Sequence, residues 1–565
     1  MSDSANSTLF PQDSRESSSL RSPVLVPKSG DDADSYLSSP DSTKYGRLPS
    51  LELEKKYDHQ SLGNSKEVDS INHEDADDER PIVYTVFDKK TKFFIVLIVA
   101  LAGLVAPLSS TMYLPAINII QEEMSTTSVM MKLTVSLYLV GMAISPMVWG
   151  TLSDTLGRRP VYIVSFIIYI GACIGNALSN SIGLLLAMRL IQSLGSSSVI
   201  AVGAGSICDI YEARQRGTAL GFFFMGALLG PVIGPIAGGY ISEYLSWRWT
   251  FWILAIVGGL ILALLTFCLP ETHRRLVATK YKANMVDLPE VSSKLMVNPL
   301  LPLYYLKYLY IVIPMLNITV VYGGMYAMAT AVPGDFARVY SLSTSDIGLT
   351  YIAGGIGNII GSIAGGNFSD FMMRRYRKRK AEELEALVEQ PETATEMETS
   401  SETKSTSTPA KGSVADANAA KLREMAIQAA IPKEQRLAGG LYFFWMLPTF
   451  LLLFGWLLEK NGSLVGVLAA QFLMGIGMTF TFASFSTYMV DIFTTRSATV
   501  TALNNSLRSL WAAVCSVIED PMEQKIGVGW TFTFFSLLQF AAGMLIIILY
   551  IHGPRWRERW APVAK

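Results

Sequence analysis

The stretch GTLSDTLGRRP (residues 150–160) follows a long apolar run, and a second stretch, GGNFSDFMMRR (residues 365–375), follows another apolar run much later in the chain. Each stretch places a Ser-Asp dipeptide after glycine and before a pair of arginines. Both stretches also come after the second apolar run of a group of six. This repetition predicts a chain built from two similar halves, with a binding site between them.

The apolar runs are long enough to cross a lipid bilayer, because a helical span needs about 20 apolar residues. A helix also satisfies its own backbone hydrogen bonds inside lipid. We expect twelve spans, at residues 93–115, 131–151, 161–179, 183–208, 218–241, 250–269, 309–333, 346–366, 438–458, 464–489, 497–519 and 530–551. The predicted fold class is an all-α membrane protein with twelve transmembrane helices in two six-helix bundles.

The positive charges between the spans predict the orientation. Most Lys and Arg residues of the connecting segments fall in alternate loops, and the other loops carry only Arg248, Arg338, Lys460 and Lys525. Lys and Arg accumulate on the cytoplasmic side of membrane proteins. We therefore expect both termini to be cytoplasmic.

Polar segments divide the chain. Residues 1–90 are expected to form a disordered cytoplasmic tail because they carry too few apolar residues to fold; phosphorylation or trafficking is one role for it, and a plain solvated tail is the alternative. The other predicted parts are an N-terminal six-helix bundle (91–270), a cytoplasmic linker (271–308), a C-terminal six-helix bundle (309–551) with an inserted cytoplasmic loop (367–437), and a cytoplasmic tail (552–565). Within the inserted loop, we expect a charged helical piece, a low-complexity stretch and a second short helix.

Composition excludes several classes of protein. The formal net charge is −1, so the basic surplus of a nucleic-acid binder is missing. The cysteines have neither zinc-ligand nor disulfide-framework spacing, and no phosphate-binding loop for ATP is present. All histidines lie outside the predicted spans, and no metal-binding or nucleophile–base group is recognisable. We therefore expect neither an enzyme nor a metal or cofactor site.

These motifs resemble those of the major facilitator superfamily. GTLSDTLGRRP resembles its cytoplasmic loop signature, RLIQSLGSSS (residues 189–198) its membrane-embedded arginine motif, and GALLGPVIGPIAGG (residues 226–239) the antiporter motif of its 12-span drug:proton branch. WRWTFW (247–252) and LPET (269–272) fit the same pattern. The Ser-rich tail, the inserted loop, YMVD (488–491) and NNSLR (504–508) are most similar to the fungal quinidine-resistance and dityrosine-exporter group.

The resemblance implies a conformational latch at the cytoplasmic helix ends, which closes the inner halves in the outward-facing state. Its expected members are Asp154, Arg158, Arg159, Asp209, Asp370, Arg374 and Asp491. An acid at such a helix end can pair with the arginines and with the N-terminal dipole of the next helix. The alternative is that the arginines only anchor the loops on the positive side. The second-half copy lacks the second glycine.

Two arginines lie inside predicted spans. Because a buried guanidinium is costly in a membrane, Arg189 must face an aqueous cavity or a partner. We expect it to act on protons and substrate in the central cavity; the alternative is a structural arginine bound to backbone carbonyls of the first span. Arg508 raises the same question.

The glycines and prolines of residues 226–239 allow helices to approach closely and to bend. We expect them to seal the cavity against leaks, which at this place is hardly distinguishable from helix packing. The motif residues are Gly226, Gly230, Pro231, Gly234, Pro235, Gly238 and Gly239.

The substrate site is expected between the halves, near the middle of the membrane. The candidates are Ser109, Thr111, Tyr113, Gln192, Phe223, Asn317, Tyr322, Tyr326, Phe482, Phe485, Asn504 and Trp511. An aromatic cage of this kind suits flat, apolar and often cationic molecules, although aromatic residues at helical spacing also serve packing. No acid falls in the middle of a predicted span, which favours a mixed apolar pocket over one for polycations.

The resemblance implies a proton-coupled antiporter that exports drugs, xenobiotics and small organic solutes, working as a monomer in the plasma membrane with the proton gradient as its energy source. One departure weakens the proton coupling: bacterial members often carry an aspartate where STMYLP (residues 110–115) has Thr111. The alternatives are a carrier of amino acids, polyamines, weak acids or a spore or cell-wall precursor such as dityrosine, a vacuolar or spore membrane, and a nutrient sensor that transports nothing.

Overall fold

The computed structural model describes residues 84–281, 301–388, 433–492 and 497–560, and every regular element in these ranges is helical. The predicted all-α fold class is confirmed. Eleven helices are long and apolar enough to cross a membrane, against twelve predicted. The remaining predicted span, 497–519, is a continuous helix that is not among these eleven. Its charged residues, which include Arg508 and Glu519, lower its mean hydropathy.

The helices follow one another in two series. The first series comprises α1 (Lys89–Thr111), η2 (Leu114–Ala116), α2 (Ile117–Glu123), α3 (Ser128–Leu156), α4 (Arg158–Ala177), α5 (Ile182–Ser196), α6 (Ser198–Ile210), α7 (Ala213–Tyr244), α8 (Trp247–Phe267) and α9 (Arg274–Tyr281). The second comprises η3 (Leu301–Lys307), α10 (Leu309–Tyr340), α11 (Thr344–Val388), η4 (Lys433–Arg436), α14 (Leu437–Phe443), α15 (Met446–Glu459), α16 (Leu464–Ile492), α17 (Ser497–Ile526) and α18 (Val528–Trp560). We call these series the first half and the second half.

Side chains at the helix starts explain several of these boundaries. Asp88, Thr127 and Ser181 each accept a hydrogen bond from a backbone N–H in the first turn of α1, α3 and α5. Such N-caps satisfy amide groups that have no partner within the helix. At the other end of α3, Gly157 has a φ of 96°, which glycine adopts without strain. The chain therefore turns sharply from α3 into α4.

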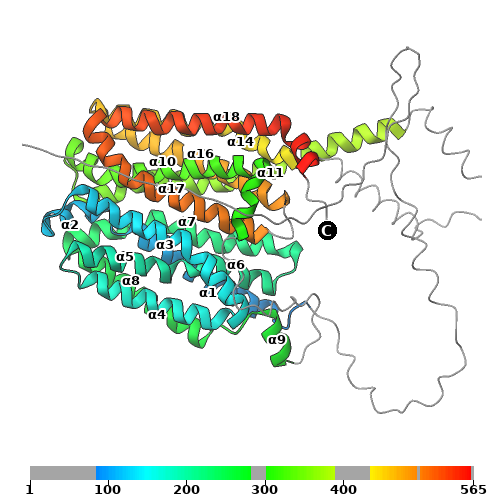
Figure 1. Cartoon of the computed structure of the whole chain (residues 1–565), viewed down its shortest axis with the longest axis horizontal. Helices are drawn as coiled ribbons and strands as arrows, with labels where there is room; N and C mark the ends of the chain where they lie inside the picture. The colour runs from blue at the N-terminus through cyan, green and yellow to red at the C-terminus, as the bar shows by residue number, and fades with distance from the viewer. Residues whose placement is uncertain (1–83, 282–300, 389–432, 493–496, 561–565) are drawn as a thin grey trace, which may run out of the picture. The chain divides into compact units, whose positions relative to one another are not determined.

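Each half packs mainly on itself. In the first half α1 packs on α7 and α4 packs on α8, while in the second half α11 packs on α16 and α15 packs on α18. The two halves meet where α3 packs on α17 and where α7 packs on α11. Figure 1 shows the first half, in blue to green, below the second half, in green to red. The contact between the halves is the seam.

The helices run roughly side by side along the long axis of Figure 1, so the bundle has two ends. We call the end that carries Gly157 and Tyr211 the inner end, and the opposite end, which carries Ser125 and Ser341, the outer end. The prediction from positive charges places the inner end in the cytoplasm. Many large apolar side chains on the outside of the bundle, such as Phe267, are exposed, as expected for surfaces that contact lipid.

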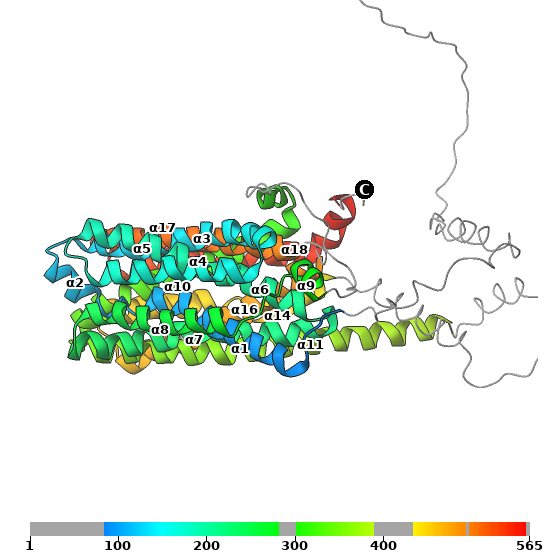
Figure 2. The same ribbon diagram turned by 90° about the horizontal axis from the view of Figure 1, so that it is seen from below.

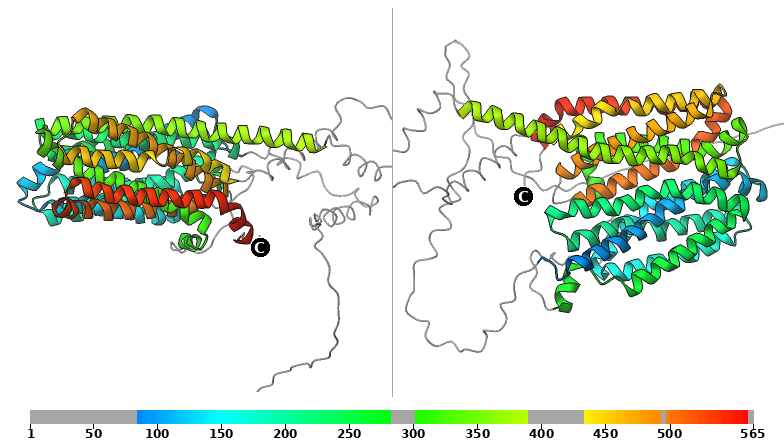
Figure 3. Two further views of the ribbon diagram at one scale, coloured as in Figure 1. Left: turned by 90° about the horizontal axis from the view of Figure 1, so that it is seen from above. Right: turned by 180° about the vertical axis from the view of Figure 1, so that it is seen from behind.

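Two predicted spans continue as helix into the segments expected to follow them. The span expected to end at residue 366 continues without a break into the inserted loop, where a charged helical piece was expected, and α11 ends at Val388. This extension reaches beyond the other helices at the inner end (Figures 2 and 3). Likewise α18 continues to Trp560 through most of the predicted tail. These extensions are rich in charge, so hydropathy ends the span while the helix continues. Residues 1–83 of the predicted disordered tail (1–90) and the second short helix of the loop lie outside the described residues. The described end of that tail already contains the N-cap Asp88 and the first residues of α1.

Candidate functional site

Arg189 is the centre of a polar cluster in the first half. Its side chain is fully buried, and its guanidinium lies over the rings of Tyr113 and Tyr138, 4.0 and 4.5 Å from their centroids. Nη1 donates to the backbone oxygen of Ser109 (3.0 Å) and to Oε1 of Gln192 (2.9 Å). The bond to Ser109 is the carbonyl contact with the first span that the structural alternative requires. Nε and Nη2 of Arg189 have no hydrogen-bond partner among the described residues.

A second arginine cluster lies in the second half. The Arg508 guanidinium lies 4.4 Å from the ring centroid of Tyr322 and 5.4 Å from that of Phe482. Tyr322 in turn contacts Tyr326, with 5.1 Å between ring centroids. The structure therefore brings together four predicted residues from α10, α16 and α17. Within the described ranges, Nε of Arg508 is buried without a hydrogen-bond partner.

One polar contact across the seam lies between the two clusters. The hydroxyl groups of Ser110, next to Ser109, and Tyr326 are 3.4 Å apart across it. The predicted residues Asn317, Asn504 and Trp511 each keep a buried polar atom that lacks a partner in the described part of the chain. Buried polar atoms normally pair with protein or water. This region can therefore make further hydrogen bonds with water or a solute, which the two asparagine oxygens would accept and Trp511 Nε1 would donate.

Other predicted site residues serve helix packing. The ring of Phe223 occupies the space that a side chain at Gly103 or Gly203 would need, and Phe485 fills the space beside Gly440 in the same way. Thr111 donates to Pro107 O (3.0 Å) and Gly230 O (3.3 Å), so its hydroxyl joins α1 to α7. These residues hold each half together.

The glycine motif of α7 packs on α1. A Cβ atom at Gly226 would lie 2.5 Å from Ala100 O, and one at Gly230 would lie 2.6 Å from Pro107 Cβ. Gly234 and Gly238 likewise contact Thr111 and Met112. Gly239 instead faces Thr344 of α11, and the oxygen of Pro235 lies against Gly348 of the same helix. Pro231 and Pro235 both lie inside α7. The motif therefore joins α7 to α1 and, across the seam, to α11.

The predicted latch of the first half is assembled at the inner end. Arg158 donates from Nε to Asp209 Oδ2 (2.9 Å) and from Nη1 to Asp154 Oδ1 (2.7 Å). Arg159 points elsewhere and donates to Thr266 O. Glu271, which we did not predict, accepts hydrogen bonds from the backbone N–H groups of Arg158 (2.9 Å) and Arg159 (3.1 Å). Its carboxylate caps α4 and complements the helix dipole.

The second half builds a similar group with a different arginine. Asp370 pairs with Arg436 at 3.3 Å, and Arg436 also pairs with Asp491. Arg374, which we expected in this role because it follows Asp370 closely, is exposed on α11. Lys433 adds a hydrogen bond to Asp491 O (2.6 Å). Each arginine group thus lies within its own half.

A charged cluster at the outer end was missed by the sequence analysis. Lys132 of α3 forms ion pairs with Glu519 and, at 3.3 Å, with Asp520, both on α17. Asp335 of α10 and Glu523 of α17 add two further carboxyl groups, whose electrostatic partners include Glu519. We call these five residues the outer-end cluster. Glu519 and Asp335 were missed because Glu519 is the last residue of a predicted span and Asp335 lies beyond another.

More polar contacts join the halves near the outer end. Glu243 accepts a hydrogen bond from Ser345 N (2.6 Å), and Asn118 donates to Pro333 O (2.9 Å). Ser506 donates to Ala143 O (2.6 Å) nearer the middle of the helices. Among the described residues, the hydrogen bonds and ion pairs between the halves lie at the outer end or in the middle, and none joins the two arginine groups at the inner end.

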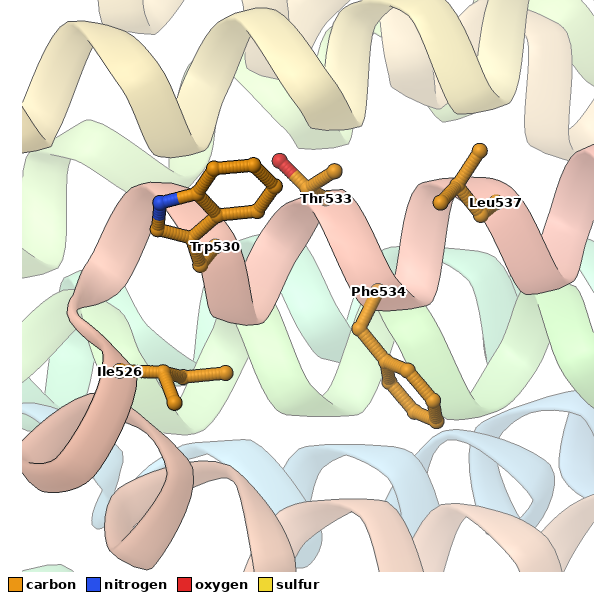
Figure 4. A pocket seen from close by; sticks show the side chains of 5 residues that line it. All are labelled: Ile526, Trp530, Thr533, Phe534 and Leu537. Carbon is orange, nitrogen blue, oxygen red and sulfur yellow. The ribbon is translucent and has the colours of Figure 1, made fainter.

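A surface pocket of 530 Å³ lies away from the seam. Its lining residues are Ile526, Trp530, Thr533, Phe534 and Leu537, and Figure 4 shows four of them on one helix, α18. Apart from Thr533, their side chains are exposed. The pocket contains none of the predicted substrate residues, and its apolar lining fits a lipid-facing groove.

Relatives with assigned names match most of the chain. It is 29% identical to the MFS-type transporter phiD of Fungal sp. (strain ATCC 74256), covering 86% of this chain and 72% of that protein. It is 28% identical to citrate exporter 1 of Aspergillus niger (84% and 88% covered) and 23% identical to the MFS antiporter QDR3 of Candida albicans (84% and 80% covered).

Solved structures share the fold. The human organic anion transporter MFSD10 (TETRAN) aligns over 80% of this chain and 99% of that one, with a TM-score of 0.52 and 15% identity. The xylose transporter XylE from E. coli aligns over 81% and 98%, with a TM-score of 0.55 and 13% identity. Residues 99–380 also match the sequence profile of the Major Facilitator Superfamily. With its two helical halves, its motifs and these relatives, the chain belongs to the major facilitator superfamily of membrane transporters.

Proposed function

We propose that this chain is a proton-coupled exporter of small organic solutes that works by alternating access. The observation that carries the proposal is the asymmetry of the seam. Lys132 and Glu519 join the halves at the outer end, whereas the groups around Arg158 and Arg436 at the inner end each stay within one half. Contacts concentrated at one end are what alternating access requires, because the seam must open at one end while it is held closed at the other.

The polar groups at the seam support a solute that combines apolar and polar surface. Aromatic rings at Tyr322, Tyr326 and Phe482 provide stacking faces, and Arg508 provides a cation. A name given to one relative, an antiporter from Candida albicans, supports exchange as the transport mode. The antiporter motif of α7 resembles that of drug:proton antiporters, and it therefore favours export of drugs or xenobiotics from the cell.

A carrier of organic acids is the second candidate. Arg508 is favourable for a carboxylate because its Nε atom is buried and has no partner in the described part of the chain. A guanidinium with free donors binds carboxylates strongly. One relative of similar length carries the name citrate exporter. On this alternative the cargo carries a carboxylate that Arg508 binds.

Flux into sealed vesicles tests both candidates. Purified full-length protein is reconstituted into liposomes, and uptake of radiolabelled cations, neutral drugs, citrate and other carboxylates is measured under an imposed pH gradient, with and without a protonophore. We expect uptake of at least one class, which the protonophore abolishes. Uptake that ignores the protonophore would refute the coupling, and the absence of uptake for every class would refute transport of these solutes.

A matched pair of variants shows that the flux belongs to this protein. Gly234→Val should abolish it, because the new side chain collides with Thr111 and Met112 of α1. Gly221→Val is the control, since nothing lies within 4 Å of a side chain added there on the same helix. The carboxylate candidate predicts in addition that Arg508→Ala removes uptake of acids but spares uptake of cations.

A further inference from the structure

The outer-end cluster holds more negative than positive charge. Its carboxyl groups belong to Asp335, Glu519, Asp520 and Glu523, and the cations that face them from the surrounding helices are Lys132 of α3 and Arg338 of α10. Arg338 pairs with Asp335 but is itself largely exposed. Within the described residues, Lys132 is therefore the one buried cation near the three carboxyl groups of α17, which belong to Glu519, Asp520 and Glu523. An ionised carboxylate left unpaired in such a place is strongly unfavourable.

The buried oxygens of the cluster also lack donors. The Glu519 side chain is fully buried. Of its two oxygens, Oε2 receives a hydrogen bond from Lys132, and no described residue donates to Oε1. The Oε1 atoms of Glu519 and Glu523 and the Oδ2 atom of Asp335 are buried without a hydrogen-bond partner in the described ranges. A native structure seldom leaves several such atoms unsatisfied. These oxygens therefore need hydrogen-bond donors, and a proton on one of the carboxyl groups would supply one.

Glu519 and Glu523 are positioned to share a proton. They lie four residues apart on α17, so both side chains project from one face of the helix. The two carboxyl groups are close enough to interact electrostatically, and each keeps a buried Oε1 atom without a hydrogen-bond partner among the described residues. Two carboxylates repel each other at this position, whereas a carboxyl and a carboxylate form a hydrogen bond. One proton between the two groups removes the surplus charge and gives both Oε1 atoms a partner.

We propose that Glu519 and Glu523 form a proton-binding site that holds one shared proton while the two halves are joined at the outer end. When α3 and α17 separate, water reaches both carboxyl groups and the proton leaves. Closing the outer end therefore takes up a proton, and by linkage a low pH favours the closed arrangement. The inference deepens the proposed function, on which it rests, by naming a site where the exchanged proton binds from the outer side.

The test measures closure of the outer end against pH. Spin labels are attached to cysteines introduced by Ser125→Cys, at the outer end of the first half, and Lys525→Cys, at the outer end of the second. Both positions are exposed, and the native Cys208 and Cys268 are replaced by serine. The distance distribution is recorded for the full-length chain in lipid nanodiscs from about pH 5 to about pH 8, where carboxyl groups of raised affinity titrate.

We expect the ratio of short to long distances to fall by at least about tenfold across this range as the pH rises, which corresponds to the uptake of about one proton. Glu523→Gln should stay closed at every pH, because its amide donates to Glu519 without titrating. Glu519→Gln should open at every pH, because Lys132 loses its strongest partner. Glu523→Asp keeps a carboxyl group and should keep a pH-dependent distribution, which shows that substitution at this position does not unfold the chain.

A control variant and two different negative results distinguish a wrong proton site from a wrong transport mechanism. Glu122→Gln removes an exposed acid at the same end and should leave the pH midpoint unchanged. A distance distribution that ignores pH in the unsubstituted chain, or a Glu523→Gln variant with its full pH dependence, overturns the proton site even if solute flux is abolished by a protonophore. Flux that ignores the protonophore, in a protein whose outer end still closes with falling pH, refutes the proposed coupling and leaves the site intact.

Discussion

The two arginine groups at the inner end have the same composition, one arginine between two aspartates, but their residues are spaced differently in the sequence. In the first half, Arg158 joins Asp154 to Asp209, and in the second half Arg436 joins Asp370 to Asp491. Arg158 is the first residue of α4, and Arg436 is the last residue of η4, directly before α14. In the first half the arginine follows its aspartate by four residues, whereas in the second half the segment 389–432 separates the two. The same contact is thus local in one half and long-range in the other.

The groups also differ in burial. The side chain of Asp209 is 14% exposed against 34% for Asp491, and that of Arg158 is 10% exposed against 16% for Arg436. The group around Arg158 is further supported by Glu271, which caps the helix that begins there. An ion pair is stronger and more costly to break when water is excluded. The first half therefore carries the more buried of the two equivalent groups.

Replacing Arg158 by alanine should have the largest effect. It leaves Asp209 buried without its cation, and breaking a buried pair in this way costs about 3–5 kcal/mol. We expect transport per molecule in the membrane to fall at least about tenfold, measured as the initial rate of uptake into vesicles and normalised to the amount of protein. Arg158→Lys keeps the charge and should retain part of the rate. A fully active Arg158→Ala variant would show that the group around Arg158 is not needed for transport.

Replacing Arg436 by alanine should reduce the same rate by less, about three- to tenfold, because its partners are more exposed and water screens the charges left behind. The measurement is the one used for Arg158→Ala, made side by side. Arg374→Ala is the matched control, since that exposed arginine is nearer to Asp370 in sequence. If Arg374→Ala proves more harmful than Arg436→Ala, the equivalence of Arg436 and Arg158 is wrong.

Asp209, at the end of α6, and Asp491, at the end of α16, should follow the same order. Asp209→Asn should lower the melting temperature in detergent more than Asp491→Asn, because its partner is the more buried arginine. An amide still accepts one hydrogen bond, so we expect a difference of about 1–2 kcal/mol in the free energy of unfolding. Equal shifts in melting temperature would mean that the deeper burial of Asp209 does not make its ion pair more stabilising than that of Asp491.

Asp154, in the last turn of α3, and Asp370, within α11, should matter least for stability. The side chains of Asp154 and Asp370 are 62% and 64% exposed, and ion pairs at exposed positions contribute about 0–1 kcal/mol. Asp154→Asn and Asp370→Asn should each leave the melting temperature nearly unchanged. A large loss of stability in either variant would show that exposure is a poor guide to the strength of these groups.

The helices and the repeated positions of the aspartates could be predicted from the amino-acid sequence. Runs of about 20 apolar residues form helices in a membrane whatever their neighbours are, and the paired Ser-Asp stretches marked equivalent positions in each half. A close helix contact could also be predicted from four glycines of α7. Gly226, Gly230, Gly234 and Gly238 are four residues apart and therefore lie on one face of the helix. Hydropathy failed where charged helices continue, as at the end of α11.

Which charged groups contact one another could not be predicted and became visible in the folded chain. Arg436 lies 66 residues after Asp370, and Glu519 lies 387 residues after Lys132, and no local pattern links residues so far apart. Their proximity follows from how the helices of the two halves pack at the seam. Hydropathy is summed over neighbours in the chain, whereas pairing and burial of charge depend on neighbours in space, so the helices were predictable and the outer-end cluster was not.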